Sequence, residues 1–230
     1  MTMFRFTTQL ISTGCLIVLV CAGCAKQSPP LKTEDNRAKT SQMSSRAGSS
    51  ASIGQMAPDF ELPGLDGRMI QLSELRGRVV VLEWFNPDCP FVKRAHGPGP
   101  LADMAKRWTA KGVFWLAINS SGPGKQGHGL DRNRRALTQF QLNHPIALDE
   151  DGRIGRLYGA ARTPQLYVIG KDGRLAYRGA LNNMPFGELT EPGASARHYV
   201  DLAIAAVLAN QPVKWAQTKP WGCSVKYARP

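Results

Sequence analysis

Residues 78–93 have the sequence RVVVLEWFNPDCPFVK, an apolar run that leads directly into a cysteine. The first half is rich in β-branched and aromatic residues, and its nearly continuous apolar character is typical of a central strand covered on both faces. The second half leaves that strand and places Cys89 at the start of a short helix. Unpaired backbone N–H groups at a helix N-terminus favour a thiolate over a thiol. The segment therefore predicts a nucleophilic cysteine at the end of the strongest strand.

Strand and helix patterns alternate on both sides of this segment. Strand patterns recur at 60–62, 69–72, 113–119, 146–148, 166–169 and 175–178. Helices are expected after Pro100, after an N-cap at Asp131, and along a last apolar stripe made of Tyr199, Leu202, Ala206 and Val207. The order indicates an α/β fold with a central mixed sheet flanked by helices and preceded by an N-terminal β-hairpin.

Length and composition fit one ordinary domain with appendages. The chain has 230 residues, of which 43% are hydrophobic, so general disorder and a fibrous repeat are excluded. Its formal net charge is +12, but the basic residues are spread along the chain without a run of five or six. We therefore expect a basic, solvated surface and no nucleic-acid partner.

The first 24 residues predict export. Arg5 gives a positive start, 10–22 is an apolar stretch too short to span a membrane comfortably, and small residues follow. The end of this segment, 20–24 (VCAGC), resembles the bacterial lipoprotein box, although Cys21 stands where that pattern has an aliphatic residue. The resemblance implies a lipid on Cys24 and a protein anchored to a membrane of the cell envelope or periplasm. Ordinary cleavage and an uncleaved anchor are the alternatives.

The chain is accordingly divided into four parts. We expect a signal peptide at 1–24, a flexible linker at 25–52, a folded domain at 53–210 and a C-terminal tail at 211–230. Three of the five cysteines precede the domain, which leaves Cys89 and Cys223 in an oxidising compartment. Such a pair is either redox-active or a structural disulfide.

Four motifs together resemble a known family, the redoxin branch of the thioredoxin superfamily, which includes the peroxiredoxins (alkyl hydroperoxide reductase/thiol-specific antioxidant). They are LSELRGRVVV at 72–81, NPDCPFVK at 86–93, NSS at 119–121 and TKPWGCSVK at 218–226, with Thr163-Pro164 between the last two. The resemblance implies a thioredoxin-like fold with Cys89 attacking and Pro164 as a cis-proline against it. It also implies a substrate groove that includes Pro90, Thr163 and Lys93.

Two departures from the family pattern limit the chemistry. No second cysteine follows Cys89 one helical turn later, so exchange within a Cys-x-x-Cys pair is excluded. Asn86 and Leu82 stand where peroxiredoxins have a threonine and a proline. The resolving thiol is then expected to be Cys223, since tail cysteines resolve several peroxiredoxins.

Glu83 is an acid in an otherwise apolar strand, six residues before Cys89. Burial there is expected to raise its pKa. Thioredoxins resemble this chain in having a buried acid at the same offset, which implies that Glu83 moves protons to and from the sulfurs. The alternative is a structural ion pair with a Lys or Arg near the strand end.

The sequence predicts no metal and no cofactor. The four histidines lack metal-ligand spacing, and no haem, dinucleotide or phosphate-loop motif is present. We expect a thiol-disulfide oxidoreductase or a peroxiredoxin-like thiol peroxidase with antioxidant activity. Its substrate is a peroxide or a protein disulfide, and it needs a thiol reductant. A non-catalytic binding module with a structural Cys89–Cys223 disulfide is the alternative, and the oligomeric state stays open. A reductant dedicated to one envelope client, as in cytochrome assembly, is disfavoured because no Cys-x-x-Cys is present.

Overall fold

A mixed five-stranded sheet with the order β5-β4-β3-β7-β8 forms the centre of the computed structural model, which describes residues 50–191 and 193–229. Its strands are β3 (Val80–Trp84), β4 (Phe114–Asn119), β5 (Ile146–Leu148), β7 (Gln165–Ile169) and β8 (Leu175–Gly179). β3 pairs in parallel with β4 and antiparallel with β7. All five residues of β3 and of β7 are buried, including Glu83 in β3 and Gln165 in β7, and the mostly apolar sequences of the two strands fit a position in the middle of the sheet.

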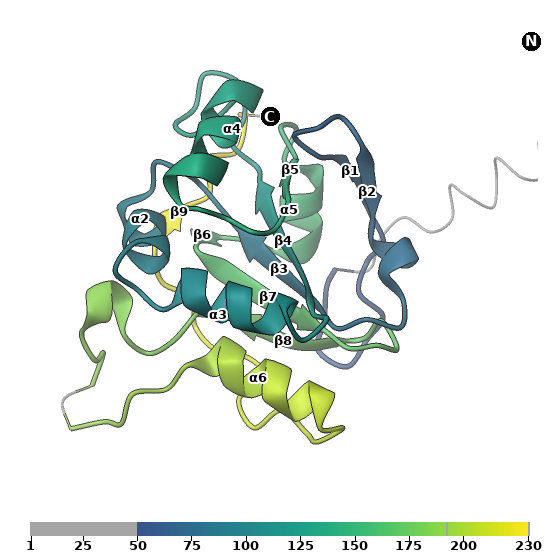
Figure 1. Ribbon diagram of the computed structural model, residues 1–230, viewed down its shortest axis with the longest axis vertical. Coiled ribbons are helices and arrows are strands. Elements are labelled where there is room, and N and C mark those ends of the chain that lie inside the picture. The colour runs from purple at the N-terminus through teal and green to yellow at the C-terminus, as the bar shows by residue number, and fades with distance from the viewer. Residues whose placement is uncertain (1–49, 192, 230) are drawn as a thin grey trace, which may run out of the picture. The chain divides into compact units, whose positions relative to one another are not determined.

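Helices cover both faces of this sheet (Figure 1). They are α2 (Pro90–His96), α3 (Leu101–Thr109), α4 (Leu130–Gln139), α5 (Arg153–Tyr158) and α6 (Tyr199–Leu208), with 3-10 turns η1 (Leu72–Leu75) and η2 (Pro185–Gly187). Side chains of α3 and α6 pack on one face of β3, beside Val79 and Val81. Side chains of α5 pack on the other face, beside Leu82 and Trp84. The predicted thioredoxin-like α/β class is confirmed.

The N-terminal hairpin consists of β1 (Glu61–Pro63) and β2 (Met69–Gln71), paired antiparallel. A bridge between Gly64 and Ala147 fixes the hairpin to the edge strand β5. The predicted hairpin extension is therefore present, and it lies over the α5 face of the sheet.

Two helix predictions were wrong in detail. Asp131 is not an N-cap: α4 begins at Leu130 after Gly129, and Asp131 lies in the first turn. The fully buried residues of α6 are Val200, Ala203 and Ile204. Of the predicted stripe, Tyr199 and Val207 pack at the edge of this cluster, whereas Leu202 is 46% exposed. This helix is apolar on nearly every side, so its periodicity did not identify the face that meets the sheet.

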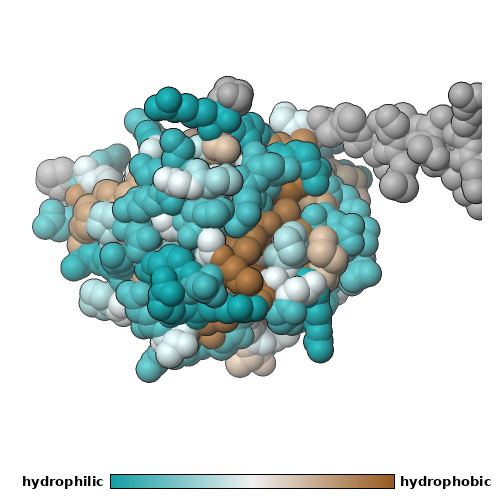
Figure 2. Space-filling model, turned by 90° about the horizontal axis from the view of Figure 1, so that it is seen from above, coloured by the Kyte–Doolittle hydropathy of each residue, from teal (hydrophilic) through white to brown (hydrophobic). Residues whose placement is uncertain are grey.

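A second small sheet joins the C-terminal segment to the entry of β7. β6 (Arg162–Thr163) pairs antiparallel with β9 (Cys223–Ser224), and the Thr163–Pro164 peptide bond is cis. Seen from above, the molecule presents a largely hydrophilic face crossed by a narrow apolar band (Figure 2).

The predictions for the signal peptide, for Cys24 and for the linker up to residue 49 concern residues outside those described. Among the helices at 50–191 and 193–229, none is long and apolar enough to cross a membrane.

Candidate active site

Cys89 lies between the end of β3 and the start of α2. It is the N-cap residue of that helix, and Pro90 fills the first helical position, where a missing N–H costs nothing. Its side chain is fully buried among Phe85, Val92 and the side chains of α4. The Cys89 thiol donates a hydrogen bond to the Thr163 carbonyl oxygen, at 3.1 Å. The predicted nucleophile is therefore held against the cis-peptide segment.

The C-terminal segment brings Cys223 to the same point. In the β6–β9 pair Cys223 is the partner of Thr163, and its sulfur lies 2.7 Å from that of Cys89. Both cysteines are thiols, without a disulfide bond. Gly222 comes so close to the Thr163 carbonyl that a Cβ there would collide with it, and its φ of +122° favours glycine. The structure thus brings together Cys89, Cys223, Thr163 and Pro164.

The segment is fixed on the N-terminal side of Cys223 by two polar contacts. The Thr218 hydroxyl accepts the Ala180 N–H at 2.9 Å, and the Trp221 indole donates to the Asn182 carbonyl at 2.7 Å. These two bonds give partners to the Ala180 N–H and the Asn182 carbonyl, both of which lie in the loop that follows β8.

Tyr227 fixes the segment on the C-terminal side. Its hydroxyl donates to the Ala160 carbonyl at 2.7 Å, and the Arg156 guanidinium lies 4.6 Å from the ring centroid. The ring fills a slot beside Gly152 and Gly155, where a Cβ at either glycine would collide with it. Cys223 is therefore held between two anchored stretches of chain and is not a loose tail.

The pKa of Cys223 is raised to about 11, first by burial and then by the hydrogen bond and charge of Cys89. Lys226 and the Phe91 backbone N–H act in the opposite direction without cancelling this. A group with that pKa keeps its proton at neutral pH. Lys226 alone therefore does not make Cys223 a thiolate, because burial and the contact with the second sulfur outweigh it.

Glu83 has a partner that the sequence analysis did not identify. His96, at the end of α2, lies with Nε2 2.7 Å from Oε1 of Glu83, and the Trp115 indole donates to Oε2 at 3.1 Å. The side chains of Glu83 and His96 are both fully buried. Burial raises the pKa of Glu83, but the charge and hydrogen bond of His96 bring it below its ordinary value. The expected rise in pKa was therefore wrong, and the ion-pair partner is a histidine instead of Lys or Arg.

His144 completes this buried cluster. Its ring lies 6.3 Å from that of His96 and 6.0 Å from that of Trp115. Burial lowers the pKa of His144 to about 4, although Glu83 acts in the opposite direction. Within residues 50–191 and 193–229 no hydrogen bond joins Glu83 to either sulfur, so the structure does not bring this acid into contact with the cysteines.

The remaining predicted groove residues lie around the first turn of α2. Pro90 and Lys93 are both exposed, and the Lys93 backbone N–H donates to the Cys89 carbonyl as part of the helix. Asp88, immediately before Cys89, is paired with Arg132 of α4, whose Nη2 lies 2.7 Å from Oδ1. Arg132 thus offsets the negative charge of the carboxylate that immediately precedes Cys89.

In the described part of the chain, no group of three or more His, Cys, Asp or Glu side chains is arranged to hold a metal ion. The polar atoms around the cysteines are carbonyl oxygens and backbone N–H groups. Their chemistry suits a thiol exchanging protons and sulfur bonds.

Several known proteins resemble this chain. The thiol-disulfide oxidoreductase ResA of Bacillus thuringiensis (strain 97-27) is 27% identical over 124 residues, which are 54% of this chain and 66% of that protein. The protein of the same name from Bacillus subtilis (strain 168) is 26% identical over 166 residues, 72% of this chain and 80% of that one. The match to the first relative thus spans just under two thirds of its length.

Solved structures extend the similarity to most of the chain. An uncharacterized conserved protein from Geobacillus kaustophilus has a TM-score of 0.68 at 26% identity, covering 78% of this chain and 94% of its own. A hypothetical protein from Sinorhizobium meliloti 1021 has a TM-score of 0.67 at 25% identity, covering 79% and 98%. The model of the AhpC/TSA family matches residues 53–178, more than half of the sequence. The chain therefore belongs to the AhpC/TSA family.

Proposed function

We propose that the protein is a thiol-disulfide oxidoreductase in which Cys89 attacks an oxidised sulfur and Cys223 resolves the product. The observation that carries this proposal is the contact between the two thiols, 2.7 Å apart at the N-terminus of α2. Relatives named thiol-disulfide oxidoreductase support the same chemistry.

The reaction transfers two electrons from the pair to the substrate. The Cys89 thiolate attacks one sulfur of a disulfide, which forms a mixed disulfide and releases the other sulfur as a thiolate. Cys223 then gives up its proton and attacks the Cys89 sulfur, releasing the second substrate thiolate and leaving a Cys89–Cys223 disulfide. A thiol reductant reopens this bond. The high pKa of Cys223 keeps this group protonated during the first step, so that Cys89 attacks alone. The part of the rise that comes from Cys89 is lost once Cys89 is in the mixed disulfide, which eases loss of the Cys223 proton in the second step.

A thiol peroxidase is the second candidate, favoured by the complete burial of Cys89 beneath the chain's own C-terminal segment. A hydroperoxide is small enough to need less opening than a protein disulfide. Attack on the peroxide oxygen would give a sulfenic acid on Cys89 and release an alkoxide or hydroxide. Condensation with the Cys223 thiol would then form the same disulfide and water. Antioxidant activity belongs to this candidate.

Asn86 would not replace the missing peroxiredoxin threonine in that reaction. Its amide donates to the Gln126 carbonyl at 3.0 Å, and its oxygen accepts the Asp88 N–H at 2.8 Å. The side chain is thus engaged with the backbone, where it shapes the loop before Cys89. Activation of a peroxide would depend on other groups.

Glu83 is proposed to act on protons through His96, because its own oxygens are engaged by His96 and Trp115. A carboxylate whose pKa is lowered is a weak base, but a hydrogen-bonded imidazole can pass a proton between neighbours. Pro164, Thr163, Pro90 and Lys93 are proposed to shape the groove that the substrate enters.

The test uses reduced full-length protein, glutathione disulfide, and the variants Cys89→Ser and Cys223→Ser. Peptide masses should show a Cys89–Cys223 disulfide in the parent and a glutathione adduct on Cys89 in Cys223→Ser. Cys223 of the Cys89→Ser variant should react far more slowly. Equal reactivity of the two cysteines would contradict the assigned roles. A parallel series with hydrogen peroxide separates the two candidates by rate.

We also propose that the protein is exported and anchored to the membrane through a lipid on Cys24. The support is the sequence of residues 1–24 alone. Radiolabelled fatty acid should be incorporated into the parent but not into Cys24→Ala, and the parent should fractionate with membranes. Equal labelling of both proteins would contradict a lipid on Cys24.

A further inference from the structure

A cavity of about 320 Å³ adjoins the redox pair on the side of α2 and α6. Phe91, two residues after Cys89, forms one wall, and Trp221, two residues before Cys223, forms another. Neither cysteine lines the cavity, but Phe91 links the cavity to the redox pair in space, because its backbone N–H hydrogen-bonds the Cys223 sulfur. Its volume lies in the range of small-ligand sites, roughly 300 to 1,000 Å³.

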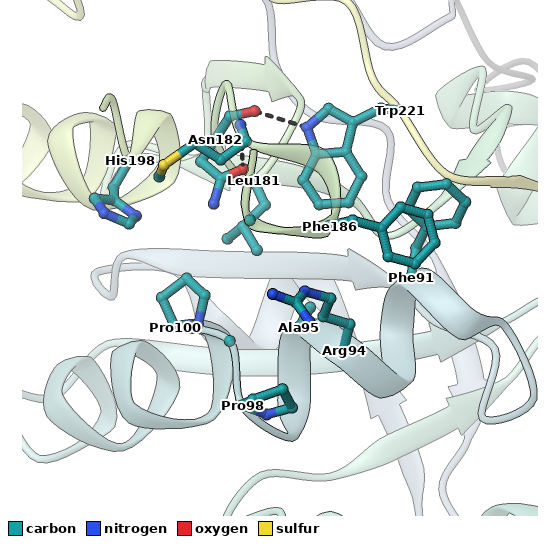
Figure 3. Close-up of a pocket in the computed structure, with 13 residues that line it drawn as sticks. Phe91, Arg94, Ala95, Pro98, Pro100, Leu181, Asn182, Phe186, His198 and Trp221 are labelled. Atoms are coloured by element: carbon teal, nitrogen blue, oxygen red, sulfur yellow. Dashed lines mark hydrogen bonds between the residues drawn. The ribbon is translucent and has the colours of Figure 1, made fainter. Parts of the chain in front are cut away.

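Aromatic rings form one end of this cavity. The ring centroids of Phe91 and Phe186 are 4.0 Å apart, and those of Phe91 and Trp221 are 5.8 Å apart. Phe186 is 45% exposed and sits at the rim (Figure 3). These rings are in contact with one another, and a flat apolar group can pack against the faces and edges that they turn toward the cavity. The aromatic end thus suits the apolar body of a ligand.

Arg94 supplies a positive charge to the same space. Its side chain extends from α2 between Pro100 and the two phenylalanines (Figure 3). The guanidinium lies against Gly187, where a Cβ would be 2.8 Å from Nη2 and where φ is +89°. Across residues 50–191 and 193–229, no carboxylate forms an ion pair with Arg94. The Arg94 guanidinium therefore has a defined position but no carboxylate partner among these residues.

His198 lies at the far end of the cavity, at the N-cap of α6. Its Nδ1 is buried and has no hydrogen-bond partner in the described part of the chain. This nitrogen is closed off from solvent, so the charge that the cavity presents to a ligand comes from the Arg94 guanidinium. Arg94 beside the aromatic end suits a ligand that carries a negative charge next to an apolar ring.

We infer that this cavity is the specificity site for the oxidised substrate and that it takes an aromatic or apolar group bearing a carboxylate. The inference rests on the proposed function of Cys89, and it adds the class of substrate that Cys89 meets. Guanidinium binds a carboxylate through two parallel hydrogen bonds, which gives orientation as well as affinity. A substrate held in this way lies beside Phe91, whose backbone N–H contacts the Cys223 sulfur, and that sulfur is 2.7 Å from the Cys89 sulfur.

Binding is tested first, without redox chemistry. The full-length chain is titrated with 2-naphthoate and with the uncharged 2-naphthamide by calorimetry. The carboxylate should bind more tightly, and Arg94→Gln should weaken it about fivefold, the value for a partly exposed ion pair. Arg135→Gln removes the same charge from an exposed site on α4 and should have no effect. Equal binding of acid and amide, or equal loss in both variants, would overturn the inference.

Reactivity is tested next, in the Cys223→Ser background, by following the mass of the Cys89 peptide. The two reagents are a carboxylated aryl disulfide, 5,5′-dithiobis(2-nitrobenzoate), and an uncharged one, 2,2′-dithiodipyridine. Each forms a mixed disulfide on Cys89 and releases one aryl thiolate. Arg94→Gln should lower the ratio of the two rate constants about fivefold, through loss of the same ion pair. An unchanged ratio would overturn the inference. If naphthoate binding depends on Arg94 while neither reagent modifies Cys89, the cavity assignment stands and the proposed function fails.

Discussion

Replacing Tyr227 with alanine should expose Cys89, because Tyr227 anchors the segment that covers it. The substitution removes the hydrogen bond to Ala160, worth about 1 kcal/mol, and the Arg156 interaction with the ring, worth about 0.5–1 kcal/mol. Loss of ring packing beside Gly155 brings the total to about 2 kcal/mol. Since a tenfold change in an equilibrium corresponds to about 1.4 kcal/mol, the open form should become roughly 30-fold more populated.

The assay is the rate at which iodoacetamide alkylates Cys89 in reduced full-length protein, read from the mass of the Cys89 peptide. Cys89 is fully buried, so the rate reports how often the C-terminal segment opens. Tyr227→Phe keeps the ring and loses only the hydrogen bond, so its rate should rise roughly fivefold. Met69→Ala, at an exposed site on β2, is the control and should leave the rate unchanged.

A Cys89 alkylation rate in Tyr227→Ala within twofold of the parent would refute this reasoning. It would mean that the contacts before Cys223, at Thr218 and Trp221, hold the segment without help from Tyr227. Urea denaturation of each variant gives an independent measure of the same contacts: because they are absent from the unfolded state as well as from the open one, Tyr227→Ala should lower the free energy of unfolding by about 2 kcal/mol.

Three further substitutions test the site. Burial lowers the pKa of His144 from 6.5 to about 4, so the unfolded chain takes up the proton first as the pH falls. About 3 kcal/mol of stability should therefore be lost between pH 6.5 and 4, and urea denaturation of His144→Leu should show a smaller loss. His96→Leu leaves Glu83 buried without its partner and should cost about 3–5 kcal/mol. Denaturation of a double variant with Glu83→Leu should recover most of this cost, and no recovery would argue against pairing. In Gly222→Ala the new Cβ meets the Thr163 carbonyl, so the Cys89–Cys223 disulfide should form more slowly after oxidation, as measured by thiol trapping. An unchanged rate would speak against the β6–β9 contact.

The central strand and the position of Cys89 could be predicted because their signals are local. A continuous apolar run identified β3, and the change of pattern after Trp84 identified the start of α2. The hairpins followed from turns rich in Gly and Asp, at 64–67 and 171–173, between short segments with apolar residues. The buried face of α6 could not be predicted, because an all-apolar helix has no periodic contrast to indicate it.

The partner of Glu83 could not be predicted because it depends on how α2 packs against the sheet. Glu83 and His96 are 13 residues apart and meet only because α2 returns along the face of β3. The sign of the change in the pKa of Glu83 follows from that partner, since burial alone gives the opposite direction. A histidine on the inner face of the helix after the cysteine is the signal that was available.

The path of the C-terminal segment also could not be predicted from local sequence patterns. Its contacts join Thr218 to the end of β8, Cys223 to β6 and Tyr227 to the segment that follows α5, over separations of 38, 60 and 67 residues. Motif resemblance identified Cys223 as a candidate, but only long-range backbone pairing brings it to Cys89. The cavity around Arg94 arises in the same way, from segments that meet after folding.

The reduction potential of the Cys89–Cys223 pair tests the central claim most directly. Full-length protein is equilibrated across a glutathione series, trapped with a thiol reagent, and analysed for the two peptides. The account predicts that both thiols titrate together with a midpoint between roughly −120 and −270 mV. A disulfide that resists reduction down to about −300 mV or below would be structural. Two thiols that never form a disulfide would remove Cys223 from the reaction. Either result would contradict the account.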